Sequence, residues 1–132
     1  MKIWYDGFNP NLLAYRPIQL FKDKKWIKTN ASFSSEIEDL TSCHGLFNEV
    51  KKIERKGQIF ESCDYFNLYI EFYSVEKDTA WFGIGDNIDL VNVNGKCYEN
   101  SLELMSNLYS ATTLELLKKN AKNENRIKNS IN

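Results

Sequence analysis

The chain has 132 residues, of which 42% are hydrophobic and 14% aromatic, so it has the length of one domain and enough apolar area for a core without a metal ion or a disulfide. No stretch approaches the roughly 20 apolar residues that span a bilayer, and the N-terminus lacks the apolar run of a signal peptide. The chain has three cysteines, which do not show Cys-x-x-Cys spacing. Together these features predict a cytoplasmic protein with reduced thiols and no membrane partner.

The net charge of −1 hides an uneven distribution along the chain. Residues 57–117 contain ten acidic and two basic residues, whereas residues 1–56 carry a net charge of +3 and residues 118–132 carry +4. An acidic centre repels phosphate, which disfavours nucleic acid as a partner. The same distribution favours a basic partner.

Two short elements open the predicted fold. Residues 2–5 form a strand, and a loop follows. Residues 17–29 alternate as a β-hairpin with its turn at Asp23-Lys24. Pro17 suits the start of an edge strand, where no donor to a neighbouring strand is lost.

The strongest helix signal lies in residues 34–57. Ser35 and Glu38 make a capping box, in which each side chain satisfies a free backbone N–H group of the first turn. Gly57 suits a left-handed cap at the end of the helix. The predicted buried stripe follows three-four spacing and comprises Ile37, Leu40, His44, Phe47 and Val50.

Residues 65–99 predict four antiparallel strands in succession. The apolar face of the first strand comprises Phe66, Leu68, Ile70 and Phe72. Its other face comprises Tyr65, Tyr69, Glu71, Tyr73 and Val75. In the next strand, Phe82 and Ile84 face the core and Trp81 points away. Asn94-Gly95 predicts a type I′ turn, since both residues accept a positive φ.

A helix over residues 100–119 closes the predicted fold, with a break near Ser110 as an alternative. Residues 118–132 are polar and basic, which predicts a frayed or disordered tail. The prediction is therefore an α+β fold in residues 1–117, with an antiparallel meander sheet of about five or six strands and two main helices.

The segment Gly83-Ile84-Gly85-Asp86 resembles several ligand-binding loops only in part. A dinucleotide fingerprint needs a third glycine where Ile88 stands, and a phosphate-binding loop needs Gly-Lys-Ser/Thr. A calcium loop starting at Asp86 needs a carboxylate where Cys97 stands. These glycines therefore predict a bulge or a close backbone approach within the sheet.

An enzymatic alternative depends on the cysteines and the single histidine. A thiol-dependent hydrolase or transferase would pair His44 with Cys63 or Cys97, oriented by a carboxylate such as Asp64. Adjacent Cys43 and His44 cannot form that pair, because neighbouring helical residues point about 100° apart. A core histidine is the simpler interpretation, and zinc is disfavoured because no paired ligand spacing is present.

Two further alternatives concern charged residues. Asp86 and Asp89, with Glu71 or Asp64, could supply paired catalytic carboxylates. A nucleic-acid-binding adaptor would use a small basic patch around Trp26, made of Lys22, Lys24, Lys25 and Lys28.

The preferred site is a protein-binding face on the acidic meander. Rings supply buried anchor area and carboxylates supply attraction for a basic protein. The predicted partner-binding residues are Tyr69, Glu71, Tyr73, Asp78, Trp81, Asp86 and Asp89. The alternative is that the C-terminal helix covers this face and the carboxylates only aid solubility.

The segment YFNLYIEFYSVEKDTAWFGIGDNIDL, residues 65–90, resembles in general character the immunity proteins of bacterial toxin systems, including contact-dependent growth inhibition. The resemblance implies a dedicated inhibitor that binds a cognate toxin domain, often a basic nuclease, and blocks its active site. Together with the residues, it predicts a non-enzymatic binding protein, for which no cofactor or metal is expected. No family motif carries it, so no residue role is transferred.

Overall fold

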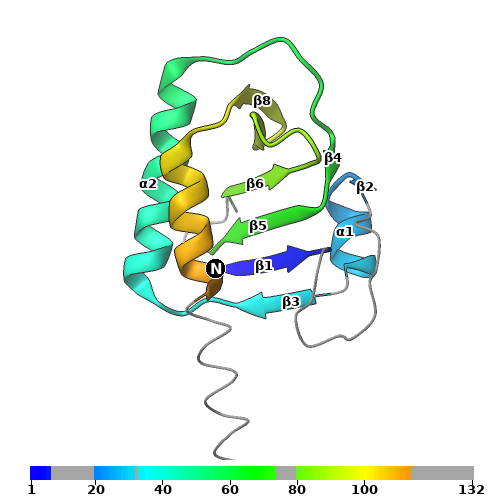
Figure 1. The fold of residues 1–132 in the computed structure, drawn as a ribbon. Helices are drawn as coiled ribbons and strands as arrows, with labels where there is room; N and C mark the ends of the chain where they lie inside the picture. Colours follow the sequence, from blue (N-terminus) through cyan, green and yellow to red (C-terminus); the bar gives the residue numbers. More distant parts are fainter. Residues whose placement is uncertain (7–19, 32, 74–79, 114–132) are drawn as a thin grey trace, which may run out of the picture.

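The computed structural model describes residues 1–6, 20–31, 33–73 and 80–113, in which six antiparallel strands form one sheet (Figure 1). The strands lie in the order β3 (Phe33–Glu36), β1 (Lys2–Tyr5), β5 (Leu68–Phe72), β6 (Ala80–Ile84), β7 (Leu90–Val93) and β8 (Lys96–Glu99). A two-stranded sheet pairs β2 (Phe21–Lys22) with β4 (Tyr65–Phe66). The described residues also form three helices, namely α1 (Lys24–Asn30), α2 (Leu40–Lys56) and a helix that includes residues 102–113. The predicted α+β class and antiparallel sheet are confirmed.

The predicted meander is present in β5, β6, β7 and β8, which pair in succession. Asn94 and Gly95 connect the last two strands with φ angles of 52° and 93°, so both residues of the turn have the predicted positive φ. Residues 102–113 are helical without a break at Ser110, and Ser101 Oγ accepts a hydrogen bond from Leu104 N at their start. The predicted tail, residues 118–132, lies outside the described residues.

The predicted start of the long helix is wrong. Ser35 lies in β3 opposite Ile3 of β1, and α2 begins five residues later at Leu40. Asp39 caps it instead, because its carboxylate accepts a hydrogen bond from Ser42 N at 3.0 Å. Gly57 ends the helix with a φ of 98°, as the sequence predicted. The pairing of β3 with β1, which lies about 30 residues earlier in the chain, has therefore overridden the capping box.

The predicted buried stripe of this helix is also wrong. The buried residues of α2 are Leu46, Val50 and Ile53, whereas Leu40, His44 and Phe47 are exposed. Ile37 is buried, but it precedes the helix. Both sets follow helical spacing, so periodicity alone did not tell which face meets the sheet.

The predicted hairpin at residues 17–29 is wrong where the structure describes it, from residue 20 onward. Residues Lys24–Asn30 form α1. Asp23, predicted at the turn, caps this helix by accepting hydrogen bonds from Lys25 N and Trp26 N at 3.0 and 3.2 Å. Ile27 is the buried residue of α1, and its tertiary packing helps to hold this short helix against the sheet.

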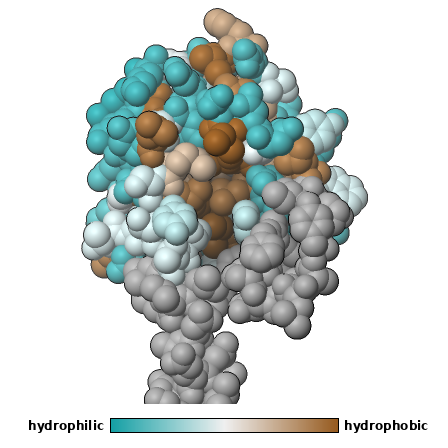
Figure 2. All heavy atoms as spheres, viewed as in Figure 1, coloured by the Kyte–Doolittle hydropathy of each residue, from teal (hydrophilic) through white to brown (hydrophobic). Residues whose placement is uncertain are grey.

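The sheet is covered on both faces. α2 and the helix 102–113 cover one face and enclose the larger core, which includes Ile3, Leu46, Ile70, Phe82, Val93 and Leu104 (Figure 1). Figure 2, seen from the same side, shows hydrophobic side chains in the middle of the visible surface, between hydrophilic ones. The opposite face carries a second core of Trp4, Ile27, Phe66 and Tyr69, with Phe21, Ala31 and Trp81 packed against it.

Phe66 lies on the opposite face from its prediction. Asn67 separates β4 from β5, and β4 pairs with β2 rather than joining the main sheet. Phe66 therefore leaves the alternation of β5 and packs in the second core, above Gly83. A Cβ atom at Gly83 would lie 2.5 Å from the Phe66 ring, and one at Gly85 would meet the carbonyl oxygen of Tyr65. The predicted close backbone approach is confirmed at Gly85, whereas at Gly83 the close neighbour is a side-chain ring.

Candidate functional site

The structure separates the predicted partner-binding residues that it describes. Tyr69 and Glu71 are buried, with 0% and 8% of their surfaces exposed, and Trp81 is half-buried. Tyr73, Asp86 and Asp89 are exposed. Asp78 lies outside the described residues. The expectation that these residues share one open face is therefore wrong for Tyr69 and Glu71.

The aromatic part of the predicted site is an internal cluster. Tyr69 lies between Trp4 and Trp81, with ring centroids 5.5 Å from each, and Phe66 lies 5.8 Å from Trp81. The cover on this face comes from α1 and β4, and not from the C-terminal helix that the alternative interpretation named. These rings are held by the protein's own residues.

Two lysines of the predicted basic patch hold this cluster. Lys28 forms an ion pair with the Glu71 carboxylate, which also accepts a 2.7 Å hydrogen bond from the Tyr69 hydroxyl. Lys28 Nζ lies 5.1 Å from the Trp4 ring centroid, and Lys24 Nζ lies 5.6 Å from that of Trp81. Lys28 and Glu71 are 43 positions apart in the sequence, which assigned the first to a basic patch and the second to an acidic site. Only the fold brings them together.

Tyr69 is held in its protonated form. Burial raises the pKa of Tyr69 well above its usual value, and the hydrogen bond to Glu71 raises it further. The unfolded chain releases this proton near pH 10, so Tyr69 stabilises the fold fully below that pH and loses its contribution as the pH rises toward the folded pKa.

We therefore expect the free energy of unfolding to fall above about pH 10, by up to about 1.4 kcal/mol per pH unit from this residue. Urea unfolding of the wild type and of Tyr69→Phe, measured from about pH 8 to about pH 11, tests this. The difference between the two proteins should shrink above pH 10. A difference that stays constant across this range would contradict the assignment.

The prediction of three reduced thiols is wrong. Cys63 and Cys97 form a disulfide, with Cα atoms 5.9 Å apart. The fold brings the two cysteines together, because the segment after α2 runs along β8 and Ile59 N donates a hydrogen bond to Cys97 O. Cys43 is the free cysteine, and its Sγ donates to Ile37 O at 3.3 Å.

The proposed pairing of His44 with Cys63 or Cys97 is absent from the described structure. Both sulfur atoms are bonded to each other, and His44 lies on an exposed side of α2. Within the described ranges, no group of three His, Cys, Asp or Glu side chains is placed to hold a metal ion.

Several exposed carboxylates lie at one edge of the molecule, where three segments meet. Asn100 N and Nδ2 donate hydrogen bonds to the carbonyl oxygens of Asp89 and Ile88, at 2.8 and 2.7 Å. On the other side of this turn, Gly85 lies against the Tyr65 backbone. We call this surface the acidic edge, and its exposed members are Asp64, Tyr65, Asp86, Ile88, Asp89, Glu99, Leu102 and Glu103.

The acidic edge combines charge with exposed apolar area. Ile88 and Leu102 expose 59% and 86% of their surfaces. Among the described residues, no ion pair engages the carboxylates of this edge. Lys22, which lies opposite Tyr65 in the two-stranded sheet, is the basic residue on the neighbouring strand. The sequence predicted Asp86 and Asp89 as partner-binding residues. It did not predict Ile88, Leu102 and Tyr65, because no periodic pattern of apolar residues joins them.

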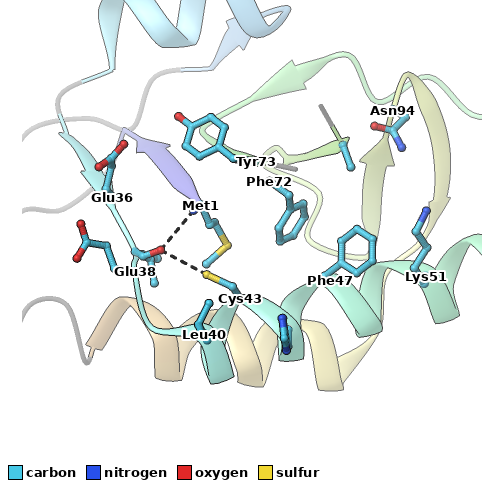
Figure 3. A pocket seen from close by; sticks show the side chains of 13 residues that line it. Met1, Glu36, Glu38, Leu40, Cys43, Phe47, Lys51, Phe72, Tyr73 and Asn94 are labelled. Carbon is cyan, nitrogen blue, oxygen red and sulfur yellow. Dashed lines mark hydrogen bonds between the residues drawn. The ribbon is translucent and has the colours of Figure 1, made fainter. Parts of the chain in front are cut away.

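A groove lies on the other side of the molecule, between α2 and the ends of β5 and β6 (Figure 3). Its volume is about 830 Å³. Leu40, Cys43 and Phe47 point into it from α2, and the facing wall includes Met1, Phe72 and Tyr73. Leu40 and Phe47 were predicted to be buried in the core. A helix face that lines a groove has the same periodicity as one that faces a core, so the sequence could not distinguish the two.

Comparisons with protein-family models, characterised proteins and solved structures find no significant match to this chain. Among the helices in the described part of the chain, none has the length and apolar character to cross a membrane. Evidence about function therefore comes from the geometry of these surfaces.

Proposed function

We propose that this protein is a non-enzymatic binding protein, an immunity-type inhibitor that binds and blocks a basic toxin or nuclease domain through the acidic edge. The observation that carries the proposal is the turn at residues 86–89, where exposed Ile88 lies between the exposed carboxylates of Asp86 and Asp89. When a partner removes such exposed apolar side chains from water, the free energy of the system falls, which favours the complex.

The two kinds of side chain serve different steps of binding. Carboxylates without internal cations attract a basic surface and increase the rate of encounter. Ile88, Leu102 and Tyr65 supply contact area that a bound partner desolvates, which slows dissociation. The site retains Asp86 and Asp89 from the sequence prediction and replaces the buried Tyr69 and Glu71 with these exposed residues.

The alternative functions draw less support from the described residues. A thiol enzyme needs a free sulfur near His44, whereas Cys63 and Cys97 are bonded to each other. A nucleic-acid adaptor needs a free basic patch, whereas Lys28 pairs with Glu71 and Lys24 lies over Trp81. The disulfide also removes the reduced-thiol argument for a cytoplasmic location, which stays a prediction.

Neutralising the turn should slow association with the partner. The partner to use is the polypeptide encoded directly upstream of this chain, because the immunity-protein resemblance implies a toxin gene there. We expect Asp86→Asn with Asp89→Asn to lower the association rate constant about 10-fold at low salt and to flatten its salt dependence. Stopped-flow mixing at two salt concentrations measures both effects.

Two further variants complete the experiment. Glu49→Gln with Glu54→Gln removes the same charge from α2, where Lys52 and Lys51 pair with these two carboxylates, and should change the rate much less. Ile88→Ser should raise the dissociation rate constant about 10-fold with little effect on association. Absence of binding to the upstream polypeptide, or equal rates for the two charge variants, would overturn the proposed function.

A further inference from the structure

The groove beside α2 carries an apolar helix face that the rest of the described chain leaves uncovered. Leu40, with 71% of its surface exposed, begins this face, and Phe47 continues it two turns later. The helix 102–113 packs on another side of α2, where Asn107 approaches Gly45. Exposed apolar side chains at helical spacing are what a partner segment would cover.

The floor of the groove is already formed and apolar. The Phe47 ring meets the Phe72 ring edge to face, with centroids 5.5 Å apart, which links α2 to the end of β5. Met1 and Ile37 line the same space, and the Met1 amino group donates to Ile37 O. A ligand would therefore meet fixed walls and would not need to create them.

Charge is distributed unequally along the groove. Glu36 and Glu38 lie at the end where α2 begins, and no ion pair among the described residues engages them. Burial raises the pKa of Tyr73, and the charges of Glu71 and Glu36 raise it further. Lys51 lies at the other end, and at about 1.5 Å per residue the helix spans about 16 Å between Leu40 and Lys51.

From this arrangement we infer that the groove binds an amphipathic peptide segment of another protein, with two or three apolar side chains on the Leu40–Phe47 face and a lysine or arginine against Glu36 and Glu38. The apolar walls of the groove select the apolar side chains of the peptide, and the unpaired carboxylates select its lysine or arginine. This site is separate from the acidic edge and does not depend on the proposed function.

Cys43 gives a direct readout of this binding. It lines the groove and is the free thiol of the chain, because the other two cysteines are joined. The probes are three synthetic 12-residue peptides: one with leucines at helical spacing and a terminal lysine pair, one with glutamates replacing the lysines, and one with serines replacing the leucines. The rate of thiol labelling of the full chain is measured as each peptide is added.

The lysine–leucine peptide should slow Cys43 labelling at least about 5-fold at saturation, and the glutamate and serine peptides should each bind at least about 10-fold more weakly. Leu40→Ser, a change at an exposed position, should weaken the lysine–leucine peptide about 10-fold. Glu36→Gln with Glu38→Gln should remove the preference for lysine over glutamate. Leu102→Ser, on the acidic edge, should leave all three affinities unchanged.

Three outcomes would overturn this inference. Equal protection by the lysine and glutamate peptides, or protection that survives Leu40→Ser, would show that the groove does not select this chemistry. Protection of Cys43 that rises with protein concentration in the absence of peptide would identify a second copy of this chain as the occupant. Leu102→Ser and the acidic-edge variants leave the groove intact, so failure here is distinguishable from failure of the proposed function.

Discussion

Replacing Cys63 and Cys97 together with serine is expected to lower the free energy of unfolding by about 4 kcal/mol. The disulfide closes a loop with a sequence separation of 34 residues, and loss of that constraint restores conformational entropy to the unfolded chain. The bond also ties the segment after α2 to β8, so its removal frees that segment in the folded state. Urea unfolding of the wild type and the double variant under oxidising conditions measures the difference.

Reduction and a matched cysteine variant provide the controls for this prediction. The wild type in excess reductant should approach the stability of the double variant. Cys43→Ser should remain within about 0.5 kcal/mol of the wild type, since Cys43 is outside the disulfide and makes one weak hydrogen bond. Equal stability of the wild type with and without reductant would show that the pair does not hold the fold together.

Replacing Lys28 with methionine is expected to cost about 2 kcal/mol of folding stability. Glu71 is buried and would lose the cation that pairs with it, although the Tyr69 hydroxyl would still donate to it. The cost is below the roughly 3–5 kcal/mol of a fully buried pair, because 38% of the Lys28 side chain is exposed. Methionine keeps an unbranched side chain over Trp4, so the change chiefly removes the charge.

The same helix supplies the control for Lys28. Lys25→Met removes an equal charge from an exposed position of α1 and should change stability by no more than about 0.5 kcal/mol. Adding Glu71→Gln to Lys28→Met should recover part of the loss, because the neutral amide oxygen still accepts from Tyr69. Equal effects of Lys25→Met and Lys28→Met would refute the role given to this ion pair.

These two predictions also separate structural from functional charge. Glu71 was predicted to face a partner, but its cation is Lys28 of the same chain. Asp86 and Asp89 have no internal cation among the described residues, and their turn exposes Ile88. A carboxylate is therefore assigned to binding here only where the fold leaves it both exposed and unpaired.

Local signals in the sequence predicted local structure correctly. Asn94-Gly95 forms the expected turn, Gly57 ends α2, and alternation places Trp81 and Phe82 on opposite faces of β6. Each of these depends on the conformational preference of one or two residues or on the two-residue repeat of a strand. Asp23 carried a similar signal, but it was interpreted as a turn residue when it is a helix cap.

The sequence by itself determined the α+β class, the succession of strands β5 to β8 and the acidic character of the chain's centre, because backbone preferences and composition act over short distances. Only the tertiary structure decided which residues meet across long separations, such as Lys28 with Glu71 and Cys63 with Cys97. It also decided which side of α2 faces the sheet. Two helix faces with equal periodicity bury comparable apolar area, and the position of the neighbouring helix selects between them.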